Sequence, residues 1–423
     1  MKESIQIHSD LDLHPAGVTG GDLAGASLHF RESSSGQVGP RRSPLRVLHV
    51  INSLNLGGTE RGVLKLMHGL SPDLFEQNIC AIRGADPSLL ESSHLGEKVG
   101  SLEEKSAGFQ FLLFRLMRIL REFRPHIVHS RNWGAIEMIP AGWLARVPVI
   151  IHSEHGYDLD MLSGLPLHRR VLRRAVYPLC DAVFTVSREL QEYHGQQSWF
   201  PTSRIRVISN GVDTDLFTPN SETRHRIREE FQYSPDTIVL GTIGRMVPIK
   251  HQKALLESAE RLIQRKFNVE VLMVGAGTEL PALQSYAKAS PVLGNRVRFL
   301  GQASQVRELF LAMDIFVLPS ITEGMSNTLL EAMASRLACV ATRVGGNPEL
   351  IEDVHSGFLF EPRDVTGLTA RLEQLILDPN RRAQVAAAAR CRVETHFSLE
   401  RMMESYTSLY VDLAAQRGLV PRN

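Results

Sequence analysis

Two glutamates stand eight residues apart in the segment PSITEGMSNTLLEAMA (319–334). Glu323 ends a loop after an apolar run, and Glu331 falls inside a predicted helix between apolar neighbours. Ionised carboxylates accept hydrogen bonds strongly, and sugar hydroxyls donate to them well. We therefore predict that one glutamate holds a transferred sugar and the other a ribose. The plainer alternative is a helix-start carboxylate favoured by the helix dipole and a second glutamate on a solvated face.

The residues between the two glutamates open the predicted helix. Backbone amides at such a position have no partner within the helix, and a glycine turn before a helix N-terminus is a ready site for an anion. The residues concerned are Gly324, Met325, Ser326 and Asn327. The segment therefore predicts backbone amides that face the cleft.

Two cations follow another apolar run, in GTIGRMVPIKH (241–251). Arg245 and Lys250 lie after a predicted strand and before a predicted helix, so their loop points into the expected cleft. Arginine offers a fork of donors and lysine a point charge, a combination that suits a diphosphate. A basic loop that is only solvated surface is the plainer alternative, because short motifs also occur by chance.

Positioning these residues requires a scaffold, and the chain alternates strands and helices twice. Continuous apolar runs such as RVLHVINS (46–53) are typical of strands buried on both faces of a parallel sheet. The predicted strands are 46–53, 78–82, 126–129, 148–152 and 182–186, then 237–244, 269–274, 296–300, 314–318 and 338–342. Helical segments between them indicate right-handed βαβ units. We predict an α/β fold of two doubly wound Rossmann-like domains with a functional cleft between them.

The segment ISNGVDTDLFTPN (208–220) interrupts this alternation, and its Asn, Asp, Gly and Pro content indicates a linker. Two domains also fit a length of 423 residues. The predicted organisation is a disordered tail (1–44), an acceptor-side domain (45–208), a linker (209–222), a donor-nucleotide domain (223–395) and a C-terminal helix that packs back toward the first domain (396–423).

Composition narrows the class of protein. Lys and Arg number 47 against 46 Asp and Glu, so no global field favours nucleic acid. The four cysteines form no CxxC pair, which indicates a reducing compartment and no disulfide framework or zinc site. The sequence contains no apolar run long enough for a transmembrane helix and no apolar core of a signal peptide. We expect a cytoplasmic protein that can associate peripherally with the inner face of the membrane.

Four segments together resemble the family 4 retaining glycosyltransferases, whose fold is called GT-B. They are the Glu323–Glu331 pair, GRMVPIKH (244–251), SNGVD (209–213) and GGNPE (345–349). Each is weak alone, but they occur in the right order, and the resemblance covers about residues 45–415.

The resemblance implies a role for each matching residue. Arg245 and Lys250 would neutralise the diphosphate of a nucleotide-sugar donor as it becomes the leaving group. Glu323 would bind the outer hydroxyls of the sugar, and Glu331 the ribose. The donor-binding segment would run through Thr328. The family commonly has glycine after the lysine, whereas this chain has His251, which puts the shape of that loop in question.

The first half of the chain resembles the family as well. NLGGTER (55–61) is similar to its first glycine loop, which implies that Gly57 and Gly58 let the backbone approach the phosphate or the acceptor. His155 follows a predicted strand and is implied to lie at the reaction centre, the alternative being a structural histidine at a strand end. EHGYD (154–158) and the Arg-rich helix after it look like the subset linked to bacterial exopolysaccharide synthesis.

Other motifs point elsewhere and are set aside. Asp213 and Asp215 form a DxD, the manganese signature of another glycosyltransferase fold, but turn chemistry in the linker explains both. We expect no metal and no cofactor, because Arg245 and Lys250 can supply the charge that a divalent ion otherwise would. VGAGTE (274–279) falls short of GxGxxG, which argues against a dinucleotide dehydrogenase.

The sequence thus predicts a retaining enzyme that moves a sugar from a nucleoside-diphosphate sugar to a glycan or lipid-linked acceptor. We favour front-face attack assisted by the departing phosphate, because no second carboxylate is placed as in glycosidases. Two alternatives stay open: a sugar-nucleotide 2-epimerase, and a non-catalytic sugar-nucleotide-binding subunit. The sequence carries no signal for the oligomeric state.

Overall fold

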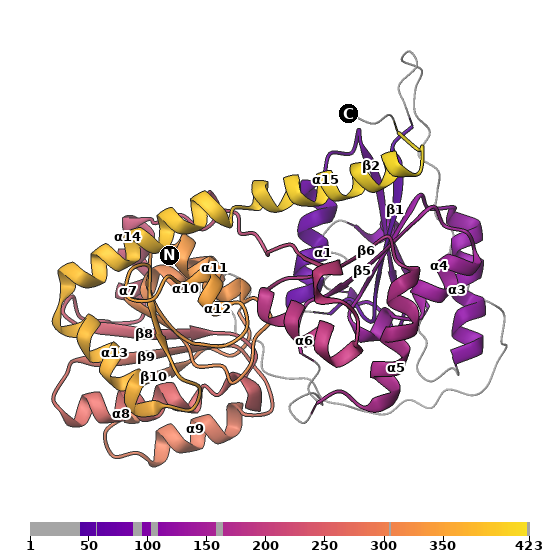
Figure 1. Cartoon of the computed structure of the whole chain (residues 1–423). Helices are drawn as coiled ribbons and strands as arrows, with labels where there is room; N and C mark the ends of the chain where they lie inside the picture. The colour runs from indigo at the N-terminus through magenta and orange to yellow at the C-terminus, as the bar shows by residue number, and fades with distance from the viewer. Residues whose placement is uncertain are drawn as a thin grey trace, which may run out of the picture.

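The computed structural model describes residues 43–55, 57–87, 95–102, 109–157, 164–303 and 306–420. Within them the two halves of the chain form two α/β layered units side by side, each built on a parallel sheet (Figure 1). This confirms the predicted fold of two Rossmann-like domains. The predicted tail (1–44) lies outside the described residues except for its last two positions.

The first domain contains a sheet of order β3-β2-β1-β4-β5-β6-β7, with all paired strands parallel. Its strands are β1 Leu45–Ile51, β2 Phe75–Ala81, β3 Val99–Ser101, β4 Ile127–Arg131, β5 Val149–Glu154, β6 Ala182–Thr185 and β7 Ile205–Val207. Its helices are α1 Gly58–Gly69, α3 Phe109–Phe123, α4 Met138–Leu144, α5 Leu167–Val176 and α6 Arg188–Ser198. The strand order reverses between β1 and β4, where open sheets of this kind place their ligands.

The second domain contains a sheet of order β10-β9-β8-β11-β12-β13, again parallel throughout. Its strands are β8 Ile238–Ile243, β9 Val269–Val274, β10 Val297–Phe299, β11 Ile315–Leu318, β12 Ala338–Thr342 and β13 Phe358–Phe360. Its helices are α7 Ser221–Glu230, α8 Lys253–Gln264, α9 Leu280–Ala289, α10 Val306–Ala312, α11 Asn327–Ala334, α12 Asn347–Leu350, α13 Val365–Leu377 and α14 Pro379–His396. Here the order reverses between β8 and β11, so Arg245 and Glu323 follow the two strands at that point.

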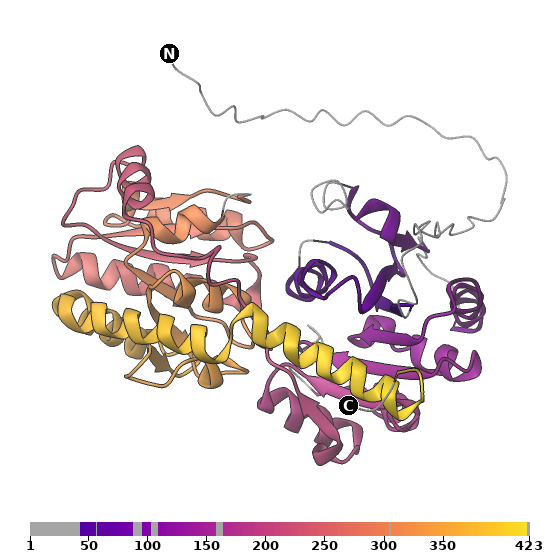
Figure 2. The ribbon, with the colours of Figure 1, turned by 90° about the horizontal axis from the view of Figure 1, so that it is seen from above.

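The chain crosses between the domains twice, and the two crossings are hydrogen-bonded to each other. The amide of Val212 donates to Phe397 at 3.0 Å, and the amide of Leu399 donates back to Val212 at 2.8 Å. After the second crossing, α15 (Leu399–Gln416) lies along the first domain, while α14 covers the second (Figure 2). Tyr410 of α15 packs edge-on against Phe75 of β2. The last long helix is therefore part of the first domain's core.

The structure contains short elements that the sequence pattern does not predict. The edge strands β3, β7 and β13 have three residues each, too few to show a hydrophobic period. Helices α6 and α7 are rich in polar residues and bury few positions, so their apolar stripe is weak. None of the helices in the described ranges is both long and apolar enough to span a membrane.

Candidate active site between the two domains

Lys250 and Glu323 meet at the cleft edge of the second sheet. Lys250 ends a short 3₁₀ turn (Pro248–Lys250) after β8, and Glu323 lies in the loop after β11. The ammonium group forms an ion pair with the carboxylate, and the hydroxyl of Ser320 donates to the same oxygen at 2.7 Å. Two of the predicted site residues, 73 positions apart in the chain, thus lie in direct contact.

The residue after Lys250 explains the shape of this loop. His251 adopts a left-handed backbone conformation with φ of 48°, which glycine takes at little cost and which few other residues favour. The loop therefore has the conformation expected of a glycine at this position, although a histidine occupies it. The side chain of Gln252 fixes the other end by donating to the carbonyl of Arg245 at 2.8 Å.

Helix α11 begins at the last of the four residues predicted to open it. Its first residue is Asn327, and the Ser326 hydroxyl caps it by accepting from the amide of Leu329 at 3.2 Å. The capped amide is that of Leu329, which lies beyond the four residues whose amides were predicted to face the cleft. Thr328 lies in the first turn of α11, and its hydroxyl oxygen is 3.2 Å from the hydroxyl oxygen of Ser326.

The loop before α11 touches the first domain rather than open space. A Cβ atom placed on Gly324 would lie 2.2 Å from the carbonyl oxygen of His155, so only glycine permits this approach. The carbonyl of Met325 accepts from the side chain of Asn210 at 3.2 Å. The side chain of Asn327 donates to the carbonyl of Gly58 at 3.3 Å. The glycine turn and the start of α11 therefore contact both the first domain and the linker.

Glu331 is buried and faces the first domain. Its side chain is 4% exposed, and its Oε2 atom has no hydrogen-bond partner among the described residues. Burial raises the pKa of this carboxyl group, whereas Lys65 and Arg61 on α1 lower it. Lys65 in turn donates to the carbonyl of Gly211 in the linker at 2.7 Å. The solvated-face alternative for Glu331 is thus wrong.

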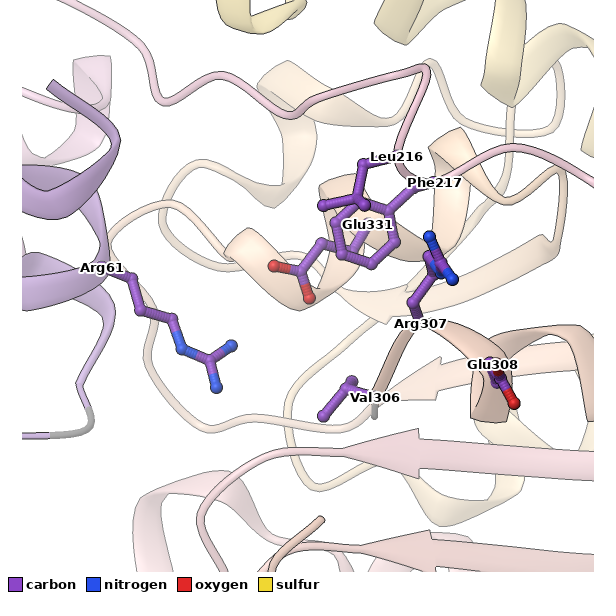
Figure 3. A pocket seen from close by; sticks show the side chains of 7 residues that line it. All are labelled: Arg61, Leu216, Phe217, Val306, Arg307, Glu308 and Glu331. Carbon is purple, nitrogen blue, oxygen red and sulfur yellow. The ribbon is translucent and has the colours of Figure 1, made fainter. Parts of the chain in front are cut away.

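Glu331 lines a cavity of about 440 Å³ at the junction of the domains. In Figure 3 its carboxylate points toward the side from which Arg61 extends. The lining residues are Arg61, Leu216, Phe217, Val306, Arg307, Glu308 and Glu331. A buried carboxylate with a free oxygen beside a cavity is suited to accept hydrogen bonds from vicinal hydroxyls.

His155 directly follows β5 and lies at the junction of the domains. Its Nε2 atom is 2.8 Å from the hydroxyl oxygen of Ser153, and its backbone amide donates to Asn132 at 2.7 Å. Burial, and then the charge of Arg131, lowers the pKa of the ring to about 3. His155 is therefore neutral at physiological pH and cannot act there as an imidazolium acid.

Gly57 and Gly58 lie at the start of α1, opposite the donor loop. Gly57 is the N-cap residue, and a Cβ there would lie 2.1 Å from the Glu60 carboxylate, which folds back over it. Burial raises the pKa of Glu60, while its bond to its own backbone amide and the charge of Arg245 lower it. Arg245 of the second domain is thus electrostatically coupled to the glycine loop of the first.

Sequence reasoning missed the charged residues of α1. Glu60, Arg61 and Lys65 follow the glycine loop directly, and the last two are four residues apart on one helix. That spacing was a usable signal, because residues one turn apart share a face. Asn132 and Asn210 carried no signal, since both are single polar residues in loops.

The EHGYD segment (154–158) begins with a buried glutamate that helps to hold the first domain together. Glu154 is buried and forms an ion pair with Arg173 of the Arg-rich α5 at 2.8 Å. Burial alone would raise the pKa of Glu154, but the charge of Arg173 holds this pKa well below its usual range. Asp158 lies outside the described residues.

The remaining predictions concern metal and cysteines. Asp213 accepts the amides of Asp215 and Leu216 at 3.1 and 2.8 Å, which is the turn chemistry expected of the linker. In the part of the chain that the structure describes, no three His, Cys, Asp or Glu side chains are grouped as metal ligands. The cysteines Cys80, Cys180, Cys339 and Cys391 are all free thiols.

Comparison with known proteins gives the same two-part division. Residues 56–216 match a family model described as Glycosyltransferase Family 4, and residues 237–378 match one described as Glycosyl transferases group 1. The UDP-Gal:alpha-D-GlcNAc-diphosphoundecaprenol alpha-1,3-galactosyltransferase of Escherichia coli is 24% identical, over 89% of this chain and 99% of that protein. A GDP-mannose-dependent alpha-(1-6)-phosphatidylinositol monomannoside mannosyltransferase of Mycolicibacterium smegmatis is 31% identical, over 65% and 74%. Among solved structures, Anabaena HepE in complex with UDP superposes with a TM-score of 0.77 at 20% identity, covering 87% of this chain and 100% of that one.

Proposed function

The chain belongs to family 4 of the glycosyltransferases, and on that premise we propose that it transfers a sugar from a nucleoside-diphosphate sugar to a lipid-linked or glycan acceptor, with retention of anomeric configuration. The observation that carries the proposal is the junction of the domains. There Lys250 and Glu323 of the second domain form an ion pair, the neighbouring Gly324 lies against His155 of the first domain, and Asn327 donates to the glycine loop at Gly58.

The chemistry assigns a task to the charged residues that the second domain brings to this junction. The bond between the anomeric carbon and the diphosphate oxygen breaks, and a bond from the same carbon to the acceptor oxygen forms. The acceptor's proton passes to the departing phosphate oxygen. Arg245 and Lys250 stabilise the negative charge that develops there, and such preorganised charge is commonly the largest catalytic term. Glu323 and Glu331 orient the sugar and the ribose.

The proposal extends to the nucleotide of the donor and to the metal requirement of the reaction. A UDP- or GDP-sugar is the expected donor, because the E. coli relative is a UDP-Gal enzyme and the M. smegmatis relative GDP-mannose-dependent by name, and the HepE structure contains UDP. No metal is needed for catalysis in this proposal, because Arg245 and Lys250 would supply the positive charge at the diphosphate. Full activity in excess EDTA supports this second part, and a loss that manganese alone restores contradicts it.

A donor panel with product analysis tests the reaction. Purified protein is incubated with UDP- and GDP-sugars and a diphosphoundecaprenol-linked saccharide, and the anomeric configuration of the product is determined by NMR. Transfer with retention is the expected result. A product of inverted configuration overturns the retaining mechanism. If the donor incubated alone yields an epimer and no mixture shows transfer, the 2-epimerase is supported. If nucleotide sugars bind without any turnover, the non-catalytic alternative is supported.

We further propose that the acceptor is met at the inner face of the membrane, during synthesis of an extracellular polysaccharide or a related glycoconjugate. The E. coli relative acts, by its name, on a saccharide carried by a diphosphoundecaprenol lipid. Such a carrier keeps the acceptor at a bilayer surface, so an enzyme that uses it needs a face that binds lipid.

The first domain has a suitable face. Helices α3 and α4 pack together on one side of the first sheet, and α5 joins α4 on that side through a shared apolar cluster. Their exposed apolar side chains are Phe111, Phe114, Trp143, Leu144, Leu167 and Val171. Exposed arginines on or next to the same helices are Arg118, Arg121, Arg146 and Arg174. Apolar side chains interspersed with arginine suit an anionic bilayer surface.

Vesicle sedimentation tests this face. We expect binding to phosphatidylglycerol vesicles that weakens with salt and that the double variant Phe111→Ser, Phe114→Ser loses roughly tenfold, because the two rings are 57% and 65% exposed. Leu377→Ser is the matched control, since Leu377 is 65% exposed on the second domain. Undiminished binding of the double variant rules out this face.

A further inference from the structure

A chain of buried side chains runs from His155 into the core of the first domain. Nε2 of His155 lies 2.8 Å from the hydroxyl oxygen of Ser153, and the same oxygen lies 2.9 Å from Nε2 of His129. Ser153 and His129 are fully buried on the neighbouring strands β5 and β4. The residue at the junction of the domains is thus bonded to a polar network beneath it.

Arg131, also buried, lies at the centre of this network. One guanidinium nitrogen is 3.1 Å from Nδ1 of His129, and the other is 3.1 Å from Nδ1 of His49. The hydroxyl of Tyr410, on α15, approaches the same Nδ1 of His129 at 2.7 Å. A guanidinium group can only donate hydrogen bonds. Both of these Nδ1 atoms must therefore accept.

This requirement fixes the protons along the whole chain. A neutral imidazole whose Nδ1 accepts carries its proton on Nε2. His129 therefore donates from Nε2 to the oxygen of Ser153. The hydroxyl of Ser153 is fully buried, and in the described residues its other bonded partner is Nε2 of His155, so its proton is satisfied by donating to that atom. His155, whose Nε2 accepts, must carry its own proton on Nδ1.

A second anchor independently fixes the tautomer of His49. The amide nitrogen of Gln77 donates to the carbonyl of Leu66 at 3.2 Å, which fixes the orientation of that side chain. Its oxygen then faces Nε2 of His49 at 3.0 Å and must receive a proton from it. His49 is thus an Nε2–H tautomer, as Arg131 also requires. Burial, aided by Arg131, lowers the pKa of His49 to about 3 and that of His129 well below its usual range, so both rings are neutral.

We propose that Arg131, acting through His129 and Ser153, is a positioning residue that fixes His155 as its Nδ1–H tautomer. The ring then offers a substrate oxygen a hydrogen-bond donor at Nδ1 and cannot accept a proton there. The tautomer follows from the geometry alone, whereas its effect on sugar transfer rests on the proposed function.

Nitrogen NMR on protein labelled at the histidine rings reads the tautomer directly. Long-range proton–nitrogen spectra distinguish Nδ1–H from Nε2–H, and the signal that vanishes in His155→Gln identifies His155. We expect Nδ1–H for His155 and Nε2–H for both His129 and His49. If His155 is in the Nε2–H form in the native protein, the proposal is overturned, whatever the spectra of the variants show.

Ser153→Ala tests the link. Without the hydroxyl, His155 should become a mixture of both tautomers while His129 keeps Nε2–H, and Ser153→Thr should restore the native spectrum. Tyr410→Phe should leave all three rings unchanged, because Arg131 still donates to His129. Ser130→Ala is the matched control, since Ser130 is equally buried and bonds a different ring, His152, at 2.8 Å.

Kinetics separate this inference from the proposed function. Ser153→Ala should lower kcat about tenfold with little change in the KM for the donor, and Ser153→Thr should recover most of the loss. An unchanged His155 tautomer in Ser153→Ala contradicts the link. If the native spectrum is as expected but no sugar is transferred, the proposed function fails while the proton arrangement stands.

Discussion

Lys250 and Arg245 each face a carboxylate of the site, Glu323 and Glu60 respectively. The ion pair holds Lys250 in place, whereas Arg245 is exposed and interacts with Glu60 through its charge. We expect Lys250→Ala and Arg245→Ala each to lower turnover on the order of a hundredfold, because a preorganised charge is lost where negative charge develops. Transfer assays measure this, with Lys253→Ala as the control, since Lys253 is three positions away and half exposed.

Near-native turnover in both site variants would remove the two cations from the mechanism. Circular dichroism must show an intact fold in each case, because Lys250→Ala leaves the buried Glu323 without its cation.

The two glutamates should differ in the part of the donor that they bind. Glu331 adjoins the cavity beside α1, whereas Glu323 pairs with Lys250 at the turn before α11. Glu331→Gln should weaken both the nucleotide sugar and the free nucleoside diphosphate, roughly tenfold or more, because both contain ribose. Glu323→Gln should impair turnover of the sugar donor and leave diphosphate binding nearly unchanged. Calorimetric titration of both ligands makes the comparison, and equal loss of the diphosphate in both variants contradicts the assignment.

Among the helices, α15 shows how sequence distance and spatial role differ. It is the last helix of the described chain, yet Leu413 is 3% exposed within a core cluster that includes Val47 and Ile127 of the first sheet. Leu413→Ala should lower the free energy of unfolding of the first domain by about 2–5 kcal/mol, since it creates a cavity in that core.

The three tryptophans, Trp133, Trp143 and Trp199, all belong to the first domain, so their fluorescence in urea reports its unfolding. Leu377→Ala, at an exposed position of the second domain, should change this transition by less than about 0.5 kcal/mol. An unshifted tryptophan transition in Leu413→Ala would show that α15 does not stabilise the first domain.

At the scale of the whole molecule, one glycine controls how closely the domains approach. A Cβ on Gly324 would lie 2.2 Å from the backbone of His155, and backbone atoms cannot move aside as a flexible side chain can. Gly324→Ala should therefore hold the domains apart, lowering kcat at least tenfold and increasing the radius of gyration in small-angle scattering with donor present. Gly62→Ala is the control, because a Cβ there meets nothing within 4 Å.

Identical scattering curves for Gly324→Ala and the native protein would show that this contact does not limit closure. A collapse in nucleoside diphosphate affinity would instead indicate damage to the second domain itself.

The sequence by itself determined the fold class. Buried parallel strands are long apolar runs, and the runs at β1, β8 and β11 carry that signal without help from tertiary contacts. It also placed Arg245, Lys250 and Glu323 at strand ends, because in a parallel sheet the residues after neighbouring strands share one edge. The roles assigned to these residues stay predictions.

Only the tertiary structure decided which residues of the first domain lie opposite the site residues of the second. The electrostatic interaction of Glu331 with Lys65 and Arg61, the contact of Gly324 with His155, and the network beneath His155 all join segments far apart in the chain. No local pattern encodes such pairs, since helical and strand periods report which face is buried and not what packs against it.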